Sequence, residues 1–151
     1  MARVIGRDDA EARALLDAVS VRLHAAVGEP ADADSSLIAE VLPEDSRMDR
    51  GEAVIEVPLE ADLDLGMGAW HVNPVDELHV VRSGEGIMEF ITVDGPVSVL
   101  VGGGDVIEIR GAEHRYRPLT PQAWLLRWSG GPDAQLTATD TGRAADPWPA
   151  V

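Results

Sequence analysis

Three of the four histidines, one glutamate and one asparagine are the residues whose types and spacing could do chemistry. His71, Asn73, Glu77 and His79 stand at odd-numbered positions, so those that share a strand share a face. His114 follows a second glycine-rich turn. Two imidazoles and one carboxylate around an open pocket are typical of sites that hold non-haem Fe(II). The pattern predicts two hairpins that direct polar groups into one pocket.

Other residues near these positions are candidates for acid–base work or substrate binding. His79 is predicted to act as an acid or base beside a metal ion, or to serve as a metal ligand itself in place of a histidine that Asn73 does not supply. Tyr116, two residues after His114, could position a substrate oxygen or donate a proton, and packing at the rim is the alternative. Arg127 could clamp a carboxylate or an enediolate, because a guanidinium binds planar anions in a bidentate way. Trp124 is predicted to pack in the core.

The elements that must position these residues begin with a helix. Asp8 is a favourable N-cap, and Glu11 completes a capping-box pattern. Apolar residues recur at helical spacing up to Val27, and Gly28 supplies a stop. The spacing predicts a helix over 8–27, followed by a linker.

From residue 37 onward the periodicity changes to that of strands. Asp94-Gly95 between two apolar runs is a strong hairpin signal. Strands are predicted at 37–42, 53–59, 63–71, 87–93, 97–101, 106–109 and 124–128, with another that carries Glu77 and His79. Short strands separated by turn signals predict a mainly β sandwich or barrel over about 37–130, within a single domain spanning 1–151. Residues 131–151 are predicted to form an extended tail that Trp148 pins.

Two motifs resemble those of the cupin superfamily. His71-x-Asn73, three residues, Glu77, six residues, Gly84 is similar to the first cupin motif, whose usual form begins His-x-His. Gly103, five residues, Ile109-Arg-Gly111, two residues, His114 is similar to the second motif, with Ile109 where proline is usual and Pro118 where asparagine is usual. The resemblance implies the cupin double-stranded β-helix, a jelly-roll barrel, preceded here by the N-terminal α-helix.

Within the cupins, residues 60–132 resemble the acireductone dioxygenases. The runs Glu77-Leu-His-Val-Val-Arg-Ser-Gly-Glu-Gly and Leu125-Leu-Arg-Trp-Ser-Gly-Gly-Pro carry that resemblance. It implies that His71, Glu77 and His114 bind a divalent metal, Fe(II) or Ni(II) as is usual there, with Mn(II) and Zn(II) as alternatives. Asn73 departs from the pattern, because a neutral amide oxygen is a weaker ligand than imidazole. Three alternatives follow. Either Asn73 is a poor fourth ligand, or the protein supplies only three ligands, or metal binding has been lost.

Composition restricts the classes of partner. The 151 residues include 12 basic and 27 acidic side chains, which gives a net charge of −15. Such a surface repels phosphate backbones and anionic membranes, so we expect neither nucleic-acid nor membrane partners. With no cysteine, no apolar run long enough to span a bilayer and no signal-peptide pattern, a cytoplasmic location is expected.

The resulting expectation is a metal-dependent enzyme similar to acireductone dioxygenases. Its substrate would be a small oxygenated metabolite, an enediol or a keto acid, chelated at the metal. A non-redox cupin isomerase, cyclase or lyase is the first alternative, because one ligand histidine is missing. A small-ligand-binding cupin without catalysis is the second. The apolar edge segments 37–42 and 53–59 could pair two copies in a homodimer.

Overall fold

The computed structural model describes residues 2–24, 51–57, 59, 66–128 and 138–151, and it describes only the backbone of 51–57 and 127. The predicted linker, the predicted strand 37–42 and Gly28 lie outside the described residues. So do residues 63–65 of the predicted strand 63–71 and residues 131–137 of the tail.

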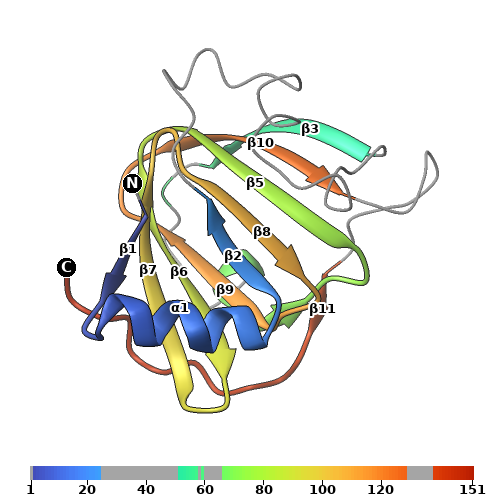
Figure 1. Ribbon diagram of the computed structural model, residues 1–151. Coiled ribbons are helices and arrows are strands. Elements are labelled where there is room, and N and C mark those ends of the chain that lie inside the picture. Colours follow the sequence, from blue (N-terminus) through green and yellow to red (C-terminus); the bar gives the residue numbers. More distant parts are fainter. Residues whose placement is uncertain (1, 25–50, 58, 60–65, 129–137) are drawn as a thin grey trace.

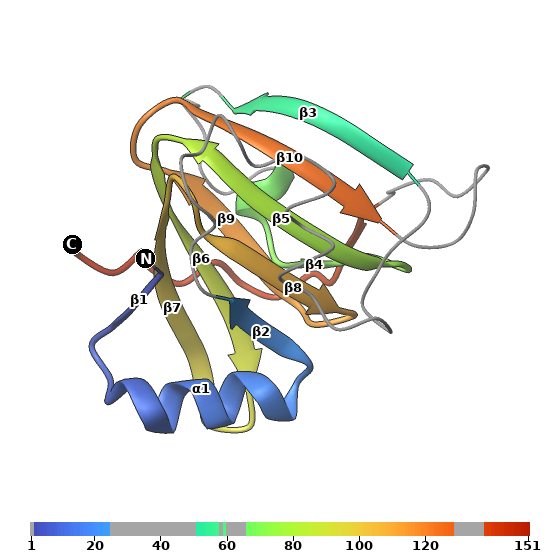
Figure 2. The ribbon, with the colours of Figure 1, turned by 45° about the horizontal axis from the view of Figure 1, so that its top comes forward.

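Two antiparallel sheets face each other and enclose the core (Figures 1 and 2). The first sheet has the order β1 (Arg3–Ile5), β7 (Gly95–Gly102), β6 (Glu85–Thr92), β9 (His114–Pro118), β4 (His71–Val72) and β11 (Thr139–Asp140). The second has the order β2 (Val21–His24), β8 (Val106–Arg110), β5 (Asp76–Ser83), β10 (Gln122–Trp128) and β3 (Gly51–Val57). The fold is mainly β and cupin-like with one N-terminal α-helix, as the sequence predicts.

Strand alternation places apolar side chains between the sheets. In β7, Val97, Val99 and Val101 have no exposed surface, and the residues between them are partly exposed. The turn between β5 and β6 depends on Gly84, which has φ +79°. A Cβ there would lie 2.3 Å from the backbone oxygen of Pro121, so only glycine fits this position of the first motif.

The predicted helix 8–27 is wrong at its C-terminal end. Helix α1 spans Asp9–Ala18, and Asp8 caps it by accepting a hydrogen bond from the backbone N–H of Glu11. Ser20 has φ 62°, which turns the chain out of the helix. Val21–His24 then forms β2 against β8. Val21 and Leu23 fit the period of a strand as well as that of a helix. The segment forms a strand because its backbone pairs with β8.

The predicted strand 63–71 is also wrong over its described part. Gly66–Gly68 forms the short 3-10 helix η3, and only His71–Val72 is a strand. Gly66 has φ +59°, which lies outside the range of a β-strand. Met67 packs partly buried against the core from this 3-10 helix, so an apolar residue at this position does not require a strand.

Within residues 138–151, the described part of the C-terminal tail, the regular element is β11, which pairs with β4. From β11 the tail passes along the first sheet toward the side of β1 and β7 (Figures 1 and 2). The guanidinium of Arg115 on β9 lies 3.9 Å from the ring centroid of Trp148 and 4.8 Å from that of Trp70. Trp148 thus pins the tail as the sequence predicts. None of the described helices is long and apolar enough to cross a membrane.

Candidate active site

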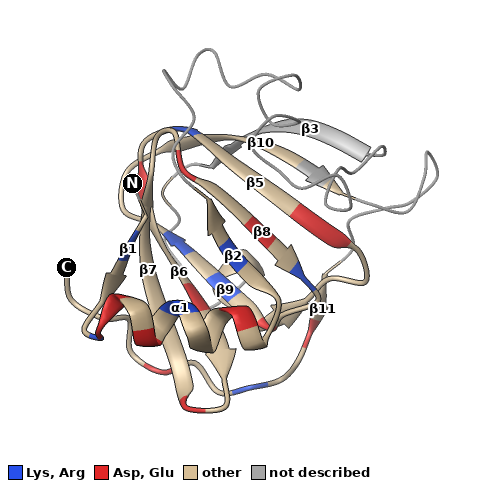
Figure 3. Cartoon of the chain, in the orientation of Figure 1, with Lys and Arg blue, Asp and Glu red and all other residues tan. Residues whose placement is uncertain are grey.

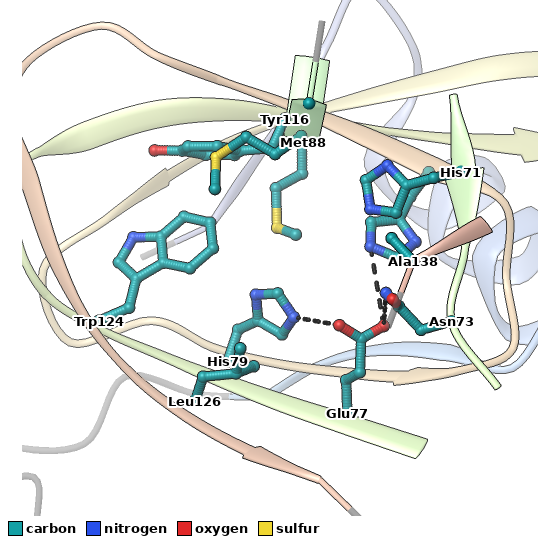
Figure 4. Close-up of a pocket in the computed structure, with 12 residues that line it drawn as sticks. His71, Asn73, Glu77, His79, Met88, Tyr116, Trp124, Leu126 and Ala138 are labelled. Carbon is teal, nitrogen blue, oxygen red and sulfur yellow. Dashed lines mark hydrogen bonds and ion pairs between the residues drawn. The ribbon is translucent and has the colours of Figure 1, made fainter. Parts of the chain in front are cut away.

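Both sheets contribute polar side chains to one cavity of about 320 Å³ (Figure 4). His71 on β4 and His114 on β9 are direct cross-strand partners in the first sheet. Glu77 and His79 lie on β5 in the second sheet, and Asn73 follows β4. Each of these five residues is buried and lines the cavity. The structure therefore brings together the five residues that the sequence predicts to share a pocket.

His71 and His114 hold the same hydrogen-bonding arrangement. The Nδ1 of His71 lies 2.8 Å from the carbonyl oxygen of Ala69, and the Nδ1 of His114 lies 2.8 Å from that of Ala112. A carbonyl only accepts, so in the neutral rings Nδ1 carries the proton and Nε2 presents a lone pair. The two ring centroids are 4.4 Å apart. Such backbone contacts orient histidines that bind metal through Nε2.

Both carboxylate oxygens of Glu77 accept a hydrogen bond. Asn73 donates from its amide nitrogen to Oε2 at 2.8 Å, and His79 donates from Nε2 to Oε1 at 3.1 Å. Burial alone raises the pKa of Glu77, but the hydrogen bond from His79, the electrostatic interactions with His79 and His114, and the hydrogen bond from Asn73 outweigh burial. The net pKa is lowered, so Glu77 is ionised at neutral pH.

His114 is held in its neutral form. Burial is the largest cause that lowers its pKa, to about 4, and the negative charge of Glu77 opposes that shift only in part. The Nε2 of His114 lies 3.7 Å from Oε2 of Glu77. At neutral pH this imidazole keeps its lone pair, so no proton competes with a metal ion for it.

The side chains of His71, His114 and Glu77 are of the chemical types that bind divalent metal ions. His114 presents an unprotonated Nε2, Glu77 presents an ionised carboxylate, and the backbone contact of His71 at Nδ1 leaves its Nε2 directed to the cavity as the second imidazole donor. Within the described ranges, no group of three or more His, Cys, Asp or Glu side chains is already arranged to hold an ion. Asn73 and His79 each use one acceptor site of the Glu77 carboxylate, and Oε2, which lies 3.7 Å from Nε2 of His114, keeps a further lone pair for a metal ion. The ligand role of Asn73 stays a prediction, since its amide nitrogen here orients Glu77.

The other side of the cavity is aromatic and thioether-rich. Tyr116, predicted near the pocket, lies there, and burial raises the pKa of its phenol well above the usual value, so the hydroxyl stays protonated. Trp124 belongs to the hydrophobic core as predicted, but it also lines the cavity. The side chain of Arg127, predicted to clamp an anion, lies outside the described residues. Met67 and Met88 also line the cavity and were not among the predicted site residues. Met88 lies opposite Tyr116 across β6 and β9, and this long-range pairing leaves no signal in the local sequence pattern.

The comparisons with known proteins support the fold. No protein-family model matches the sequence, and no curated protein matches it. A solved structure of acireductone dioxygenase from Bacillus anthracis, with a cadmium ion in its active center, is similar to this chain with a TM-score of 0.54. The similarity covers 85% of this chain and 91% of that one at 17% sequence identity. At this identity the likeness shows a shared cupin-like fold, in agreement with the two sheets described above.

Proposed function

We propose that the protein is a metal-dependent enzyme that acts on a small oxygenated metabolite within the cavity. The paired His71 and His114, each with Nδ1 on a backbone carbonyl and Nε2 left as a lone pair, carry this proposal. Glu77 supplies the carboxylate of a set of two histidines and one acid. The cadmium-containing acireductone dioxygenase of similar fold supports a divalent metal, with Fe(II) first and Ni(II), Mn(II) and Zn(II) as alternatives.

Each residue has a defined part in this proposal. A bound metal supplies Lewis acidity and a template for two substrate oxygens. Asn73 holds one oxygen of Glu77 and so sets the direction of the carboxylate. His79 moves a proton at Nδ1, the ring nitrogen that has no hydrogen-bond partner among the described residues. Tyr116 is a neutral hydroxyl that can donate to a substrate oxygen.

Elemental analysis and metal titration test the proposal. The purified protein should bind one equivalent of metal. His71→Ala and His114→Ala should each weaken binding by about a hundredfold or more, because each removes a ligand itself rather than a group that only orients a ligand. His24→Ala is the matched control, because His24 lies on β2 in contact with Glu108 and is not among the residues that line this cavity. Oxygen uptake with an enediol that stops in His114→Ala supports a dioxygenase. Metal affinity that is equal in all four proteins contradicts the proposal.

A non-redox enzyme is the second candidate, and the contact between His79 and Glu77 favours it. The carboxylate accepts from Nε2 and leaves Nδ1 as the basic atom. A base so oriented can remove a proton from carbon next to a carbonyl, which leaves the electron pair in the enolate. This candidate predicts exchange of the substrate's α-hydrogen with deuterium under strict anaerobiosis. Strict dependence of turnover on oxygen excludes it.

A further inference from the structure

The cavity has two unlike halves. Figure 4 shows His71, Asn73 and Glu77 on one side and Trp124 and Tyr116 on the other, with His79 between them. The second half is completed by apolar side chains from η3, β6 and β10, which are Met67, Met88 and Leu126. Ala138 of the tail lies on the first side, near His71 and Asn73 (Figure 4).

Aromatic rings form a wall along the second half. The ring centroids of His79 and Trp124 are 5.1 Å apart, and those of Trp124 and Tyr116 are 4.4 Å apart in an edge-on contact. Met67 and Met88 add polarisable thioethers, which make favourable contacts with aromatic rings. Rings and sulfur atoms at close range favour a flat, conjugated ligand over a bulky aliphatic one.

The charges around the cavity oppose an anionic ligand. No Lys or Arg stands among the described residues that line it, and Glu77 is an ionised carboxylate. A carboxylate or phosphate on the ligand would lose its hydration without a cationic partner in the apolar half. The described lining of the apolar half therefore offers no cationic side chain to a keto acid, the other substrate class that the sequence predicts.

We infer that the ligand is a neutral, flat, conjugated molecule with two neighbouring oxygen atoms, such as a catechol or a ring-bound α-hydroxyketone. The oxygen pair faces His71, Glu77 and His114, and the ring lies against Trp124 and Tyr116. The inference of two neighbouring oxygen atoms depends on the proposed metal function. The inference of a neutral ring depends only on the residues that line the second half of the cavity. A cavity of about 320 Å³ is at the small end of ligand sites and suits one substituted ring.

Calorimetric titration with three matched probes tests this inference. The probes are 3-methylcatechol, which is neutral and flat, 2,3-dihydroxybenzoate, which is charged and flat, and cis-1,2-cyclohexanediol, which is neutral and not flat. We expect 3-methylcatechol to bind about tenfold or more tightly than either other probe at neutral pH. Equal or tighter binding of 2,3-dihydroxybenzoate or cyclohexanediol, or no binding of 3-methylcatechol at millimolar concentration, overturns the inference.

Titration with and without Zn(II) separates the inference from the proposed function. Zn(II) is redox-inert, so the catechol is not consumed during the measurement. If Zn(II) leaves the affinity for 3-methylcatechol unchanged and the order of the probes holds, the metal proposal fails and the ligand class stands. If Zn(II) tightens binding and the order reverses, the ligand class fails and the metal proposal stands.

A pair of lysine variants tests the charge argument directly. Met67→Lys places an ammonium at a partly buried position in the lining of the cavity. Val93→Lys places the same charge in the turn between β6 and β7, where the side chain of Val93 is 90% exposed. Only Met67→Lys should improve the binding of 2,3-dihydroxybenzoate, by about tenfold. An equal effect of both variants contradicts selection by the cavity lining.

Discussion

His79 is the residue on which the two proposed functions divide. Its Nε2 donates to Glu77, and its buried Nδ1 has no partner among the described residues. Beside a metal, this contact would fix one oxygen of Glu77, while the other oxygen lies 3.7 Å from Nε2 of His114. Without a metal, the same contact makes Glu77 the group that orients a base. The same hydrogen bond is therefore compatible with both proposed functions, and the dependence of turnover on oxygen distinguishes them.

Asn73 offers the sharpest test of the metal site. Asn73→His restores the His-x-His of the first cupin motif and adds an imidazole ligand next to His71. We expect the affinity for Zn(II) or Ni(II) to rise by about tenfold or more, measured by competition with a chromophoric chelator.

Asn73→Ala is the matched control for that variant. It removes the hydrogen bond to Glu77 without adding a ligand, so it should leave metal affinity equal or lower. If Asn73→His binds metal no better than Asn73→Ala, the cavity does not hold an ion at this position.

The metal-free protein should lose stability in acid through His114. Its pKa is about 4 when folded and near 6.5 when unfolded, so between these values the unfolded chain binds a proton that the folded chain does not. Stability is then fully present above pH 6.5 and falls as the pH drops toward 4, by on the order of 3 kcal/mol. Glu77, whose folded pKa is lowered, adds a further loss as the pH falls below its ordinary value of 4.5.

Urea unfolding at several pH values in the presence of a chelator measures this loss. His114→Gln keeps the size and a polar end but cannot take up a proton in this range. Its free energy of unfolding should vary less between pH 6.5 and 4 than that of the wild type. Identical slopes would show that other groups cause the acid sensitivity.

The sequence predicted the site better than the elements that hold it. Side-chain parity along β5 and the two motifs place Glu77, His79 and His114 correctly, because a strand has a fixed period of two. The predicted helix is too long because Val21 and Leu23 fit both the helical period and the strand period. Only the long-range pairing of β2 with β8 shows that this segment is a strand. The thioether side of the cavity was missed because it depends on which strands face each other, a long-range property that local patterns do not contain.

The C-terminal tail is an element that supports the site from outside. β11 pairs with β4, the short strand that carries His71, and Thr141 donates a backbone hydrogen bond to the carbonyl of Trp70. Glu113, next to His114, binds Arg143 of the tail at 2.9 Å. The hydrogen bond from Arg143 is the largest cause that lowers the pKa of Glu113. The tail thus holds the outer edge of β4, which carries His71, and binds the residue that precedes His114.

Removing the stacking ring of the tail should weaken this support. Trp148→Leu keeps an apolar side chain but removes the ring above Arg115, whose guanidinium also pairs with Glu89 and donates to the backbone of Asp146. We expect a loss of about 1 kcal/mol in the free energy of unfolding. Pro149→Ala, at the next position, is the control, and an equal loss there would show that stacking is not the cause.

The acidic surface is a property of the whole molecule. Twelve basic residues against 27 acidic ones leave a net charge of −15. Among the described elements, acidic side chains are spread over the helix and both sheets rather than gathered on one element (Figure 3). Surface pairs such as Arg7–Asp94 and Arg13–Asp9 are exposed and contribute little individually. The compact state therefore carries unfavourable self-repulsion, which expansion on unfolding relieves.

Salt should consequently stabilise the protein. Raising NaCl from about 10 mM to about 0.5 M shortens the screening length several-fold and should raise the melting temperature by a few degrees. The double variant Val93→Lys/Ala145→Lys adds two positive charges at exposed positions outside the cavity lining. Its melting temperature should be higher than that of the wild type at low salt, and its gain on adding salt should be smaller. A fall in melting temperature with NaCl would instead show that the surface ion pairs outweigh the repulsion among the excess acidic side chains.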